Sequence, residues 1–117
     1  MRVRYTAASR KRRKKILQRA KGFKGARGTR LRVAKEALLH AGVYAYRDRK
    51  AKKRTIRRLW ITRISAFVRA NGMSYSRFIE GLTKAKVRVN RKVLANLAIE
   101  DTDVMMKYME LAQKNVG

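Results

Sequence analysis

The fold of this chain depends on residues 29–71, which read TRLRVAKEALLHAGVYAYRDRKAKKRTIRRLWITRISAFVRAN. The stretch has no proline and a single glycine, Gly42, and residues with high helix propensity dominate it. Thr29 can cap its start, and Gly72, the next residue after it, can end it in the left-handed conformation. We therefore predict one long helix over this stretch.

The surface of this predicted helix changes along its length. Apolar residues spaced three and four apart mark one face near its start and again near its end: Leu31, Ala34, Leu38, Ala41 and Ala45, then Ile56, Trp60, Ile64, Phe67 and Val68. Between these two faces, eight of the twelve residues at 47–58 are cations. Like charges four residues apart destabilise an isolated helix, so we expect this middle part to need a polyanion beside it.

Positive charge is concentrated in the first half of the chain. The first 58 residues hold 23 of the 33 Lys and Arg residues and only two acids, Glu36 and Asp48, which leaves a net charge of +21. The other 59 residues hold ten cations and five acids, a net charge of +5. A small domain needs a net charge of only about 2–8 for solubility. The excess therefore predicts a polyanionic partner, which we interpret as a nucleic acid.

Residues 1–28 read as a basic arm. Arg10 to Lys15 are six consecutive cations, and the apolar residues of positions 16–23 make at most one short amphipathic stripe. Gly22, Gly25 and Gly28 then interrupt any helix, because each costs about 1 kcal/mol relative to alanine in a helix interior.

Residues 73–117 predict three short helices, each starting at a capping side chain. Ser74 caps 75–84, Asn90 caps 91–99, and Asp101 or Thr102 caps 103–115. Their apolar stripes are Phe78, Ile79 and Leu82; Val93, Leu94, Leu97 and Ala98; and Val104, Met105, Tyr108, Met109, Leu111 and Ala112. Packed on the apolar end of the long helix, they predict a four-helix globule.

The fold prediction is therefore all-α, with a long basic N-terminal arm and an extended helix joined to a small C-terminal helical globule. We place the boundary between the basic extension, residues 1–58, and the C-terminal domain, residues 59–117, inside the long helix, where the cations of residues 47–58 give way to the apolar stripe.

Catalytic and cofactor sites are not predicted. The chain has no cysteine and one histidine, His40, whose only acidic neighbour within a helical turn is Glu36, so a contact with RNA or a neighbouring residue explains it better than catalysis. Glu100, Asp101 and Asp103 are explained as acids at a helix N-terminus, so no metal site is expected. No glycine-rich phosphate loop follows a predicted strand, so a nucleotide-binding fingerprint is not supported. We expect no small-molecule substrate.

Targeting segments are not predicted either. No apolar run approaches the ~20 residues that span a bilayer, and the charge begins at Arg2 without the apolar stretch of a secretory signal. We expect a mature, intracellular chain without a membrane partner.

The candidate nucleic-acid contacts are mainly the cations of the arm and the long helix. The mixture of Arg and Lys favours recognition of phosphates and shape over base edges. Aromatic residues lie among these cations: Trp60 falls on an apolar stripe and should anchor the globule, whereas Tyr44 and Tyr46 fit RNA stacking and a structural role equally well. The predicted nucleic-acid-binding residues are Arg10, Lys11, Arg12, Arg13, Lys14, Lys15, Lys21, Arg27, Arg30, Arg32, Tyr44, Tyr46, Arg47, Arg49, Lys50, Lys52, Lys53, Arg54, Arg57 and Arg58.

Five blocks of sequence resemble the bacterial-type large-subunit ribosomal protein L20 family. They are KKIL at 14–17, AKGFKGAR at 20–27, YAYRDR at 44–49, LWI at 59–61 with Arg63 and Ile64, and NGMSYS at 71–76 with FI at 78–79 and GL at 81–82. The resemblance covers nearly the whole chain. Departures from the family pattern are Met1–Ser9, Lys24 in place of an aromatic residue, Phe67 in place of a small one, and Asn90 and Asn96 in place of acids.

This resemblance implies a structural constituent of the large ribosomal subunit, without catalysis or a cofactor. Family members bind large-subunit rRNA directly, act early in subunit assembly, and contact neighbouring large-subunit proteins such as proteins thirteen and twenty-one. Some repress translation of their own messenger through the C-terminal domain. The expected location is the cytoplasmic ribosome of a bacterium, or an organellar ribosome for an organelle-encoded chain.

Two other classes of function fit a small basic chain. A DNA-compacting protein normally needs dimer symmetry or side chains that wedge into the minor groove. A membrane-active amphipathic peptide needs a continuous apolar face, and residues 47–56 interrupt that face.

Overall fold

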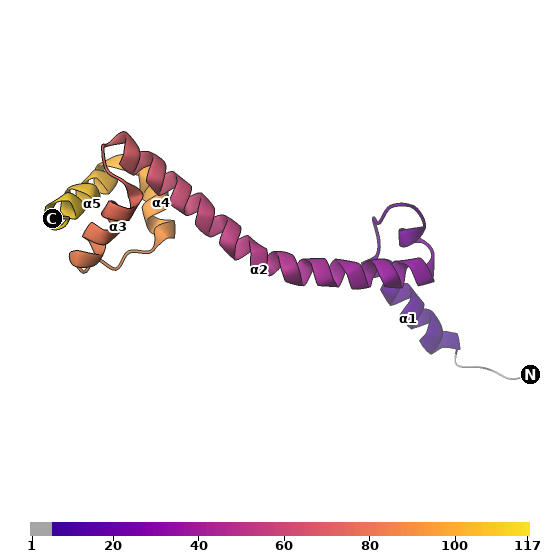
Figure 1. Cartoon of the computed structure of the whole chain (residues 1–117). Coiled ribbons are helices and arrows are strands. Elements are labelled where there is room, and N and C mark those ends of the chain that lie inside the picture. Colours follow the sequence, from indigo (N-terminus) through magenta and orange to yellow (C-terminus); the bar gives the residue numbers. More distant parts are fainter. Residues whose placement is uncertain (1–5) are drawn as a thin grey trace, which may run out of the picture. The chain divides into compact units, whose positions relative to one another are not determined.

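The structure is a computed structural model that describes residues 6–117. Most of the segment Met1–Ser9, which departs from the family pattern, therefore lies outside the described residues. Within this range the chain is helical and contains no strand, which confirms the all-α prediction. The elements are α1 (Thr6–Arg19), the 3-10 turn η1 (Gly25–Gly28), α2 (Leu31–Ala70), α3 (Tyr75–Lys84), α4 (Arg91–Glu100) and α5 (Thr102–Asn115) (Figure 1).

The chain divides into two compact units, the residues up to Lys50 and the residues Ala51–Gly117. The division falls inside α2, so one continuous helix contributes to both units.

Helix α2 confirms the long helix predicted from residues 29–71, but Thr29 is not its N-cap. The backbone N–H groups of Thr29 and Arg30 both donate to the carbonyl oxygen of Ala26, at 3.2 and 2.8 Å, so Thr29 closes η1 instead. The first bond of α2 then runs from the N–H of Ala34 to the carbonyl of Arg30. The helix starts one residue later than predicted because the 3-10 turn uses Thr29.

The first unit has a very small apolar interior. Helix α1 contains the six consecutive cations, and Lys and Arg have good helix propensity. The helix ends before Gly22, which has a φ of +89°. The chain then turns back, and the alanines Ala20 and Ala34 are fully buried. Gly28 fits this turn because a Cβ there would lie 2.9 Å from the carbonyl oxygen of Phe23.

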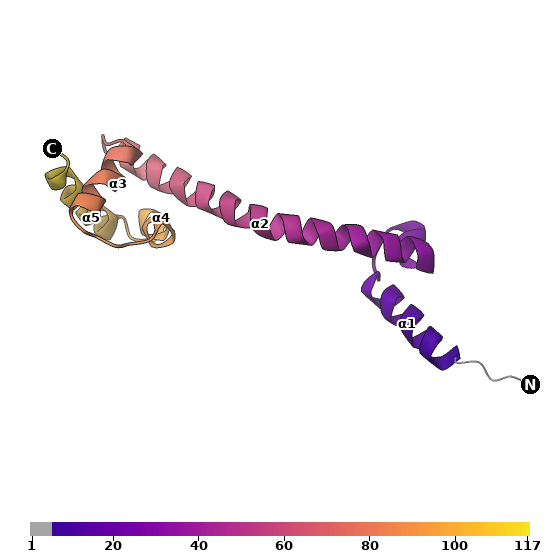
Figure 2. The same cartoon turned by 60° about the horizontal axis from the view of Figure 1, so that its bottom comes forward.

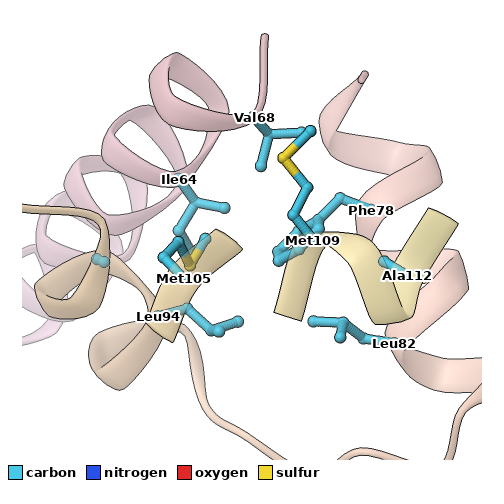
Figure 3. Packing of buried hydrophobic residues seen from close by; sticks show 9 residues of the cluster. Ile64, Val68, Phe78, Leu82, Leu94, Met105, Met109 and Ala112 are labelled. Carbon is cyan, nitrogen blue, oxygen red and sulfur yellow. The ribbon is translucent and has the colours of Figure 1, made fainter. Parts of the chain in front are cut away.

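The second unit holds the main core. Helices α3, α4 and α5 gather around the C-terminal end of α2 in both views of the ribbon (Figures 1 and 2). Figure 3 shows Ile64 and Val68 of α2 directed toward the methionines of α5. The buried cluster comprises Ile64, Val68, Phe78, Leu82, Leu94, Ala95, Met105, Met109 and Ala112, with Trp60 packed against it.

The apolar stripes predict most of this core. They misassign two residues of α4, Val93 and Ala95, and one residue of α5, Leu111. Val93 is 44% exposed and Leu111 is 37% exposed, although both belong to predicted stripes, whereas Ala95 is fully buried. Helix α4 packs on α5, and the side of α4 that bears Ala95 faces the core.

All three predicted caps of the C-terminal helices are present. Side-chain oxygens of Ser74, Asn90 and Asp101 accept hydrogen bonds from backbone N–H groups three residues later, at 3.4, 2.9 and 3.3 Å. Gly72, with a φ of +86°, ends α2 as predicted. In the same type of ending, Lys86 terminates α3 with a φ of +58°, and the N–H of Val87 donates to the carbonyl of Leu82 at 3.0 Å.

Candidate nucleic-acid interface

All the predicted site cations of α1 and of the loop after it are exposed. Arg10–Lys15 occupy six successive positions of α1, so they surround that helix on all sides. Lys21, Arg27, Arg30 and Arg32 follow in the turn and at the start of α2, and each is exposed as well. The fold therefore buries none of these charges.

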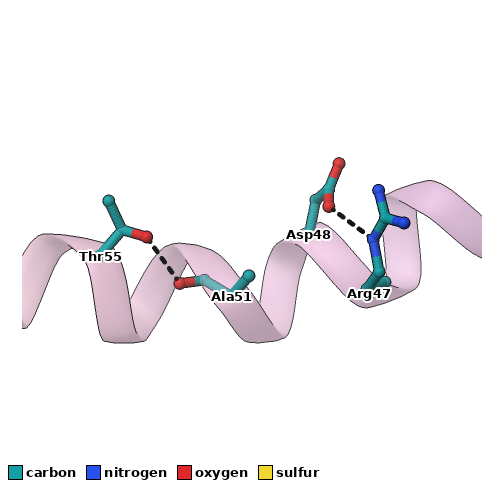
Figure 4. Close-up of polar contacts among 4 residues, drawn as sticks. All are labelled: Arg47, Asp48, Ala51 and Thr55. Carbon is teal, nitrogen blue, oxygen red and sulfur yellow. Dashed lines mark hydrogen bonds and ion pairs between the residues drawn. The ribbon is translucent and has the colours of Figure 1, made fainter.

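The cations of residues 47–58 form an exposed sleeve on α2. At 3.6 residues per turn they are distributed around the helix, and only the side that carries Asp48, Ala51 and Thr55 lacks one. Figure 4 shows this part of the helix, where the Thr55 hydroxyl donates to the carbonyl oxygen of Ala51 at 3.1 Å. Within the sleeve, the Arg47 guanidinium is the one that pairs with a carboxylate, that of Asp48 at 3.1 Å (Figure 4).

Few of the cations on this surface are neutralised by the protein itself. In the part of the chain that the structure describes, the ion pairs are Arg47–Asp48 and Lys84–Glu80. The second pair lies on α3, where the hydrogen bond and the charge of Lys84 lower the pKa of the exposed Glu80 carboxyl. The 21 Lys and Arg side chains of residues 6–58 are all exposed. Their mutual repulsion would be relieved by negative charge supplied from outside the chain.

The two tyrosines of the predicted site remain at the surface. Tyr44 is 50% and Tyr46 is 61% exposed. A cation from the following turn covers one ring face of each: the Arg47 guanidinium carbon lies 5.0 Å from the Tyr44 centroid, and the Lys50 Nζ lies 5.5 Å from the Tyr46 centroid. Neither ring is part of a core, whereas Trp60 packs against the core of the second unit as predicted.

A hollow of about 640 Å³ opens in the first unit beside these residues. The turn after α1 supplies Phe23, Lys24 and Arg27, and α2 supplies one face that includes Glu36, His40 and Tyr44. The His40 and Tyr44 rings are 6.0 Å apart between centroids, with their planes inclined by 31°. Sequence reasoning did not identify this hollow. The only signal for it in the sequence was the spacing of four residues that separates Glu36, His40 and Tyr44.

A second hollow, of about 690 Å³, is apolar. It lies between α1 and α2, and the residues that line it are Ile16, Arg19, Lys35, Leu38, Leu39, Gly42, Val43 and Tyr46. Leu39 is 72% and Val43 is 64% exposed, so the hollow presents apolar side chains within a strongly cationic unit.

Other kinds of site are not found in residues 6–117. No three His, Cys, Asp or Glu side chains come close enough there to hold a metal ion. None of the helices in that range combines the length and the apolar character that crossing a membrane requires.

Comparison with known proteins identifies the family. A family model described as Ribosomal protein L20 matches residues 2–108. The chain belongs to the ribosomal protein L20 family. A protein of Carboxydothermus hydrogenoformans named large ribosomal subunit protein bL20 is 50% identical over 115 residues, which cover 98% of each chain. A protein of the same name from Bordetella pertussis is 57% identical over 100 residues, which cover 86% of this chain and 84% of that one.

Membership of the L20 family confirms the resemblance drawn from the five sequence blocks. Members of this family are structural proteins of the large ribosomal subunit, and this chain is therefore a ribosomal protein and not an enzyme. The family match extends across both units, from the cationic helices to α5.

Proposed function

We propose that this ribosomal protein binds large-subunit rRNA directly through the predicted residues of its first 58 positions, and that residues 59–117 form its C-terminal domain. The observation that supports the proposal is that all 21 cations of residues 6–58 are exposed and that, of these, Arg47 has a carboxylate partner. Neighbouring cations on these helices repel one another, and nearby phosphates stabilise the helices because each phosphate attracts the cations beside it.

The mechanism is electrostatic. Each cation that neutralises a phosphate releases a condensed counterion, so affinity depends steeply on salt. Cations on all sides of α1 and on most sides of the α2 sleeve suit a helix inserted among several RNA strands. A role in early assembly of the subunit follows, because a chain that neutralises crowded phosphates allows rRNA helices to approach one another.

Salt dependence tests the direct contact with rRNA. Engagement of ten phosphates predicts a slope of roughly −7 to −9 for log affinity against log salt concentration. The measurement uses the full chain and a transcript of large-subunit rRNA, with duplex DNA as competitor. A slope shallower than about −3, or equal competition by DNA, would contradict the proposal.

A pair of matched variants localises the contact. Lys52→Gln with Lys53→Gln removes two charges from the α2 sleeve, and the slope should become less steep by about 1.4–1.8. Lys107→Gln with Lys114→Gln removes two charges from exposed positions of α5 and should leave the slope unchanged. Equal effects of the two pairs would show that the sleeve has no special role.

The assembly role is tested by reconstitution of the large subunit without this protein. Particles should stop at an intermediate sedimentation value and resume assembly when the full chain is added. Complete particles formed without the protein would refute the role.

Neighbouring large-subunit proteins are the second proposed class of partner. The apolar hollow with Leu39 and Val43 supports this, because exposed apolar side chains suit a protein surface better than phosphates. A photo-crosslinker at position 43 in assembled particles should capture ribosomal proteins, and capture of rRNA alone would contradict the proposal.

Repression of its own messenger is proposed from family membership, with residues 59–117 as the messenger-binding part. Added protein should lower translation of a reporter that carries the chain's own leader, and unchanged translation would exclude the mechanism. Since both relatives are bacterial, we place the protein at the cytoplasmic ribosome of a bacterium; the organellar location would apply to an organelle-encoded chain.

A further inference from the structure

We propose that the hollow of about 640 Å³ in the first unit holds one unpaired guanine base of RNA, stacked on aromatic rings and read by the Glu36 carboxylate. The inference rests on the proposed function, because it takes RNA as the partner. It adds base recognition to an interface that otherwise contacts phosphates.

The hollow has the size and the walls that a base requires. Its volume falls within the range of roughly 300–1,000 Å³ that small-molecule sites occupy. Three rings line it, those of Phe23, His40 and Tyr44, and they come from two different elements. Unpaired RNA bases stack on such rings. The Arg47 guanidinium covers Tyr44 at 5.0 Å, and this helps to hold the ring in place.

Glu36 is the residue that a phosphate-binding surface does not explain. It is one of two acids among the first 58 residues, and a carboxylate repels phosphates. The other acid, Asp48, is paired with Arg47 at 3.1 Å, whereas Glu36 has no ion pair within the described residues, although Arg32 precedes it by one helical turn. A carboxylate left unpaired among cations is available to accept hydrogen bonds from a ligand.

Guanine matches this carboxylate better than the other bases. Its Watson–Crick edge presents two adjacent N–H donors, from N1 and N2, and a carboxylate has two acceptor oxygens. Uracil offers one N–H between two carbonyl oxygens, which the carboxylate repels. Lys24 and Arg27 on the rim of the hollow then neutralise the phosphates on either side of the bound nucleotide.

The test compares RNA pentamers that differ only at the central base. UUGUU, UUIUU with inosine, UUAUU, UUCUU and UUUUU carry the same phosphates, so the electrostatic contribution to binding is equal. Fluorescence anisotropy with the full chain at 0.3 M salt should show UUGUU binding roughly ten-fold tighter than UUUUU, within the range that one bidentate contact to a base provides. Inosine lacks the N2 amino group, so UUIUU should fall between the two.

Two charge-matched variants separate base reading from general attraction. Glu36→Gln and Asp48→Asn each raise the net charge by one, so both should strengthen binding of UUUUU through general attraction to the phosphates. Glu36→Gln should also bring the preference for guanine to within two-fold of uracil, because an amide N–H meets a guanine N–H, whereas Asp48→Asn should keep the ten-fold ratio. Tyr44→Leu should weaken UUGUU at least three-fold relative to the wild-type chain.

The outcomes distinguish this inference from the proposed function. Equal binding of the pentamers by the wild-type chain, with a steep salt dependence, overturns the base site and leaves the phosphate contact in place. Loss of the guanine preference in Asp48→Asn as well as in Glu36→Gln also overturns it. Absence of binding to every pentamer and to rRNA at low salt overturns the proposed function itself.

Discussion

Replacement of Gly81 by alanine tests the closest approach between two helices of the second unit. Gly81 is buried on α3 against Ala112 of α5. A Cβ at position 81 would lie 2.7 Å from the Cα and 2.8 Å from the carbonyl carbon of Ala112, and closer still to its carbonyl oxygen. All three are backbone atoms, so no side-chain rotation relieves the overlap, and α3 must move away from α5.

The expected loss combines two opposing effects. Overpacking a core costs about 1–3 kcal/mol, and a contact with rigid backbone belongs at the upper end of that range. Alanine is favoured over glycine by about 1 kcal/mol in a helix interior, which offsets part of the loss. The free energy of unfolding should therefore fall by about 2 kcal/mol, and the melting temperature of the second unit by about 8–16 °C.

Fluorescence of Trp60 during thermal and urea unfolding of the full chain provides the measurement. Trp60 is the only tryptophan and packs against the core of the second unit, so its emission reports on that unit alone. Gly42→Ala is the matched control, because Gly42 lies inside α2 with nothing within 4 Å of an added Cβ. It should raise helicity without loss of stability.

One result would refute this reasoning: a Gly81→Ala chain that unfolds at or above the wild-type temperature, since α3 and α5 would then not approach at this point. Ala112→Gly should not rescue the variant, because the overlapping atoms belong to the backbone.

Substitutions at three further positions test the helix ends and one long-range bond, each by urea unfolding followed through Trp60. Lys86→Gly should stabilise the second unit by up to about 1 kcal/mol, because it removes a side chain from a positive φ; lower stability would mean that Lys86 is not strained. Asn90→Ala should lower the free energy of unfolding by about 1 kcal/mol, because the N-cap of α4 is lost. Asn90→Asp should retain the cap and the stability. Tyr75→Phe should cost about 1 kcal/mol, because it removes the 2.8 Å hydrogen bond that Arg91 Nε donates to the phenol oxygen; an unchanged midpoint would show that this bond contributes nothing.

Features that depend on neighbouring residues were predictable from the sequence. Helix α2, the caps of α3, α4 and α5, and the glycine end of α2 follow from propensity and from hydrogen bonds that span three or four residues. The uneven distribution of charge is a matter of counting, and it indicated the polyanionic partner without any coordinates.

Features that depend on how helices meet were decided only by the tertiary structure. Helix α4 buries Ala95 and leaves Val93 exposed, and periodicity alone does not specify which side of the helix the core covers. The close approach at Gly81 and the bond between Arg91 and Tyr75 join residues 31 and 16 positions apart.

The hollow beside Glu36 illustrates the same division for function. The sequence by itself placed Glu36, His40 and Tyr44 on one helical face, because a spacing of four residues returns to the same side of a helix. It did not predict that Phe23 and Lys24 would lie opposite them. That arrangement arises because the chain turns back after α1 at Gly22 and closes η1 on Thr29, which brings the turn against α2.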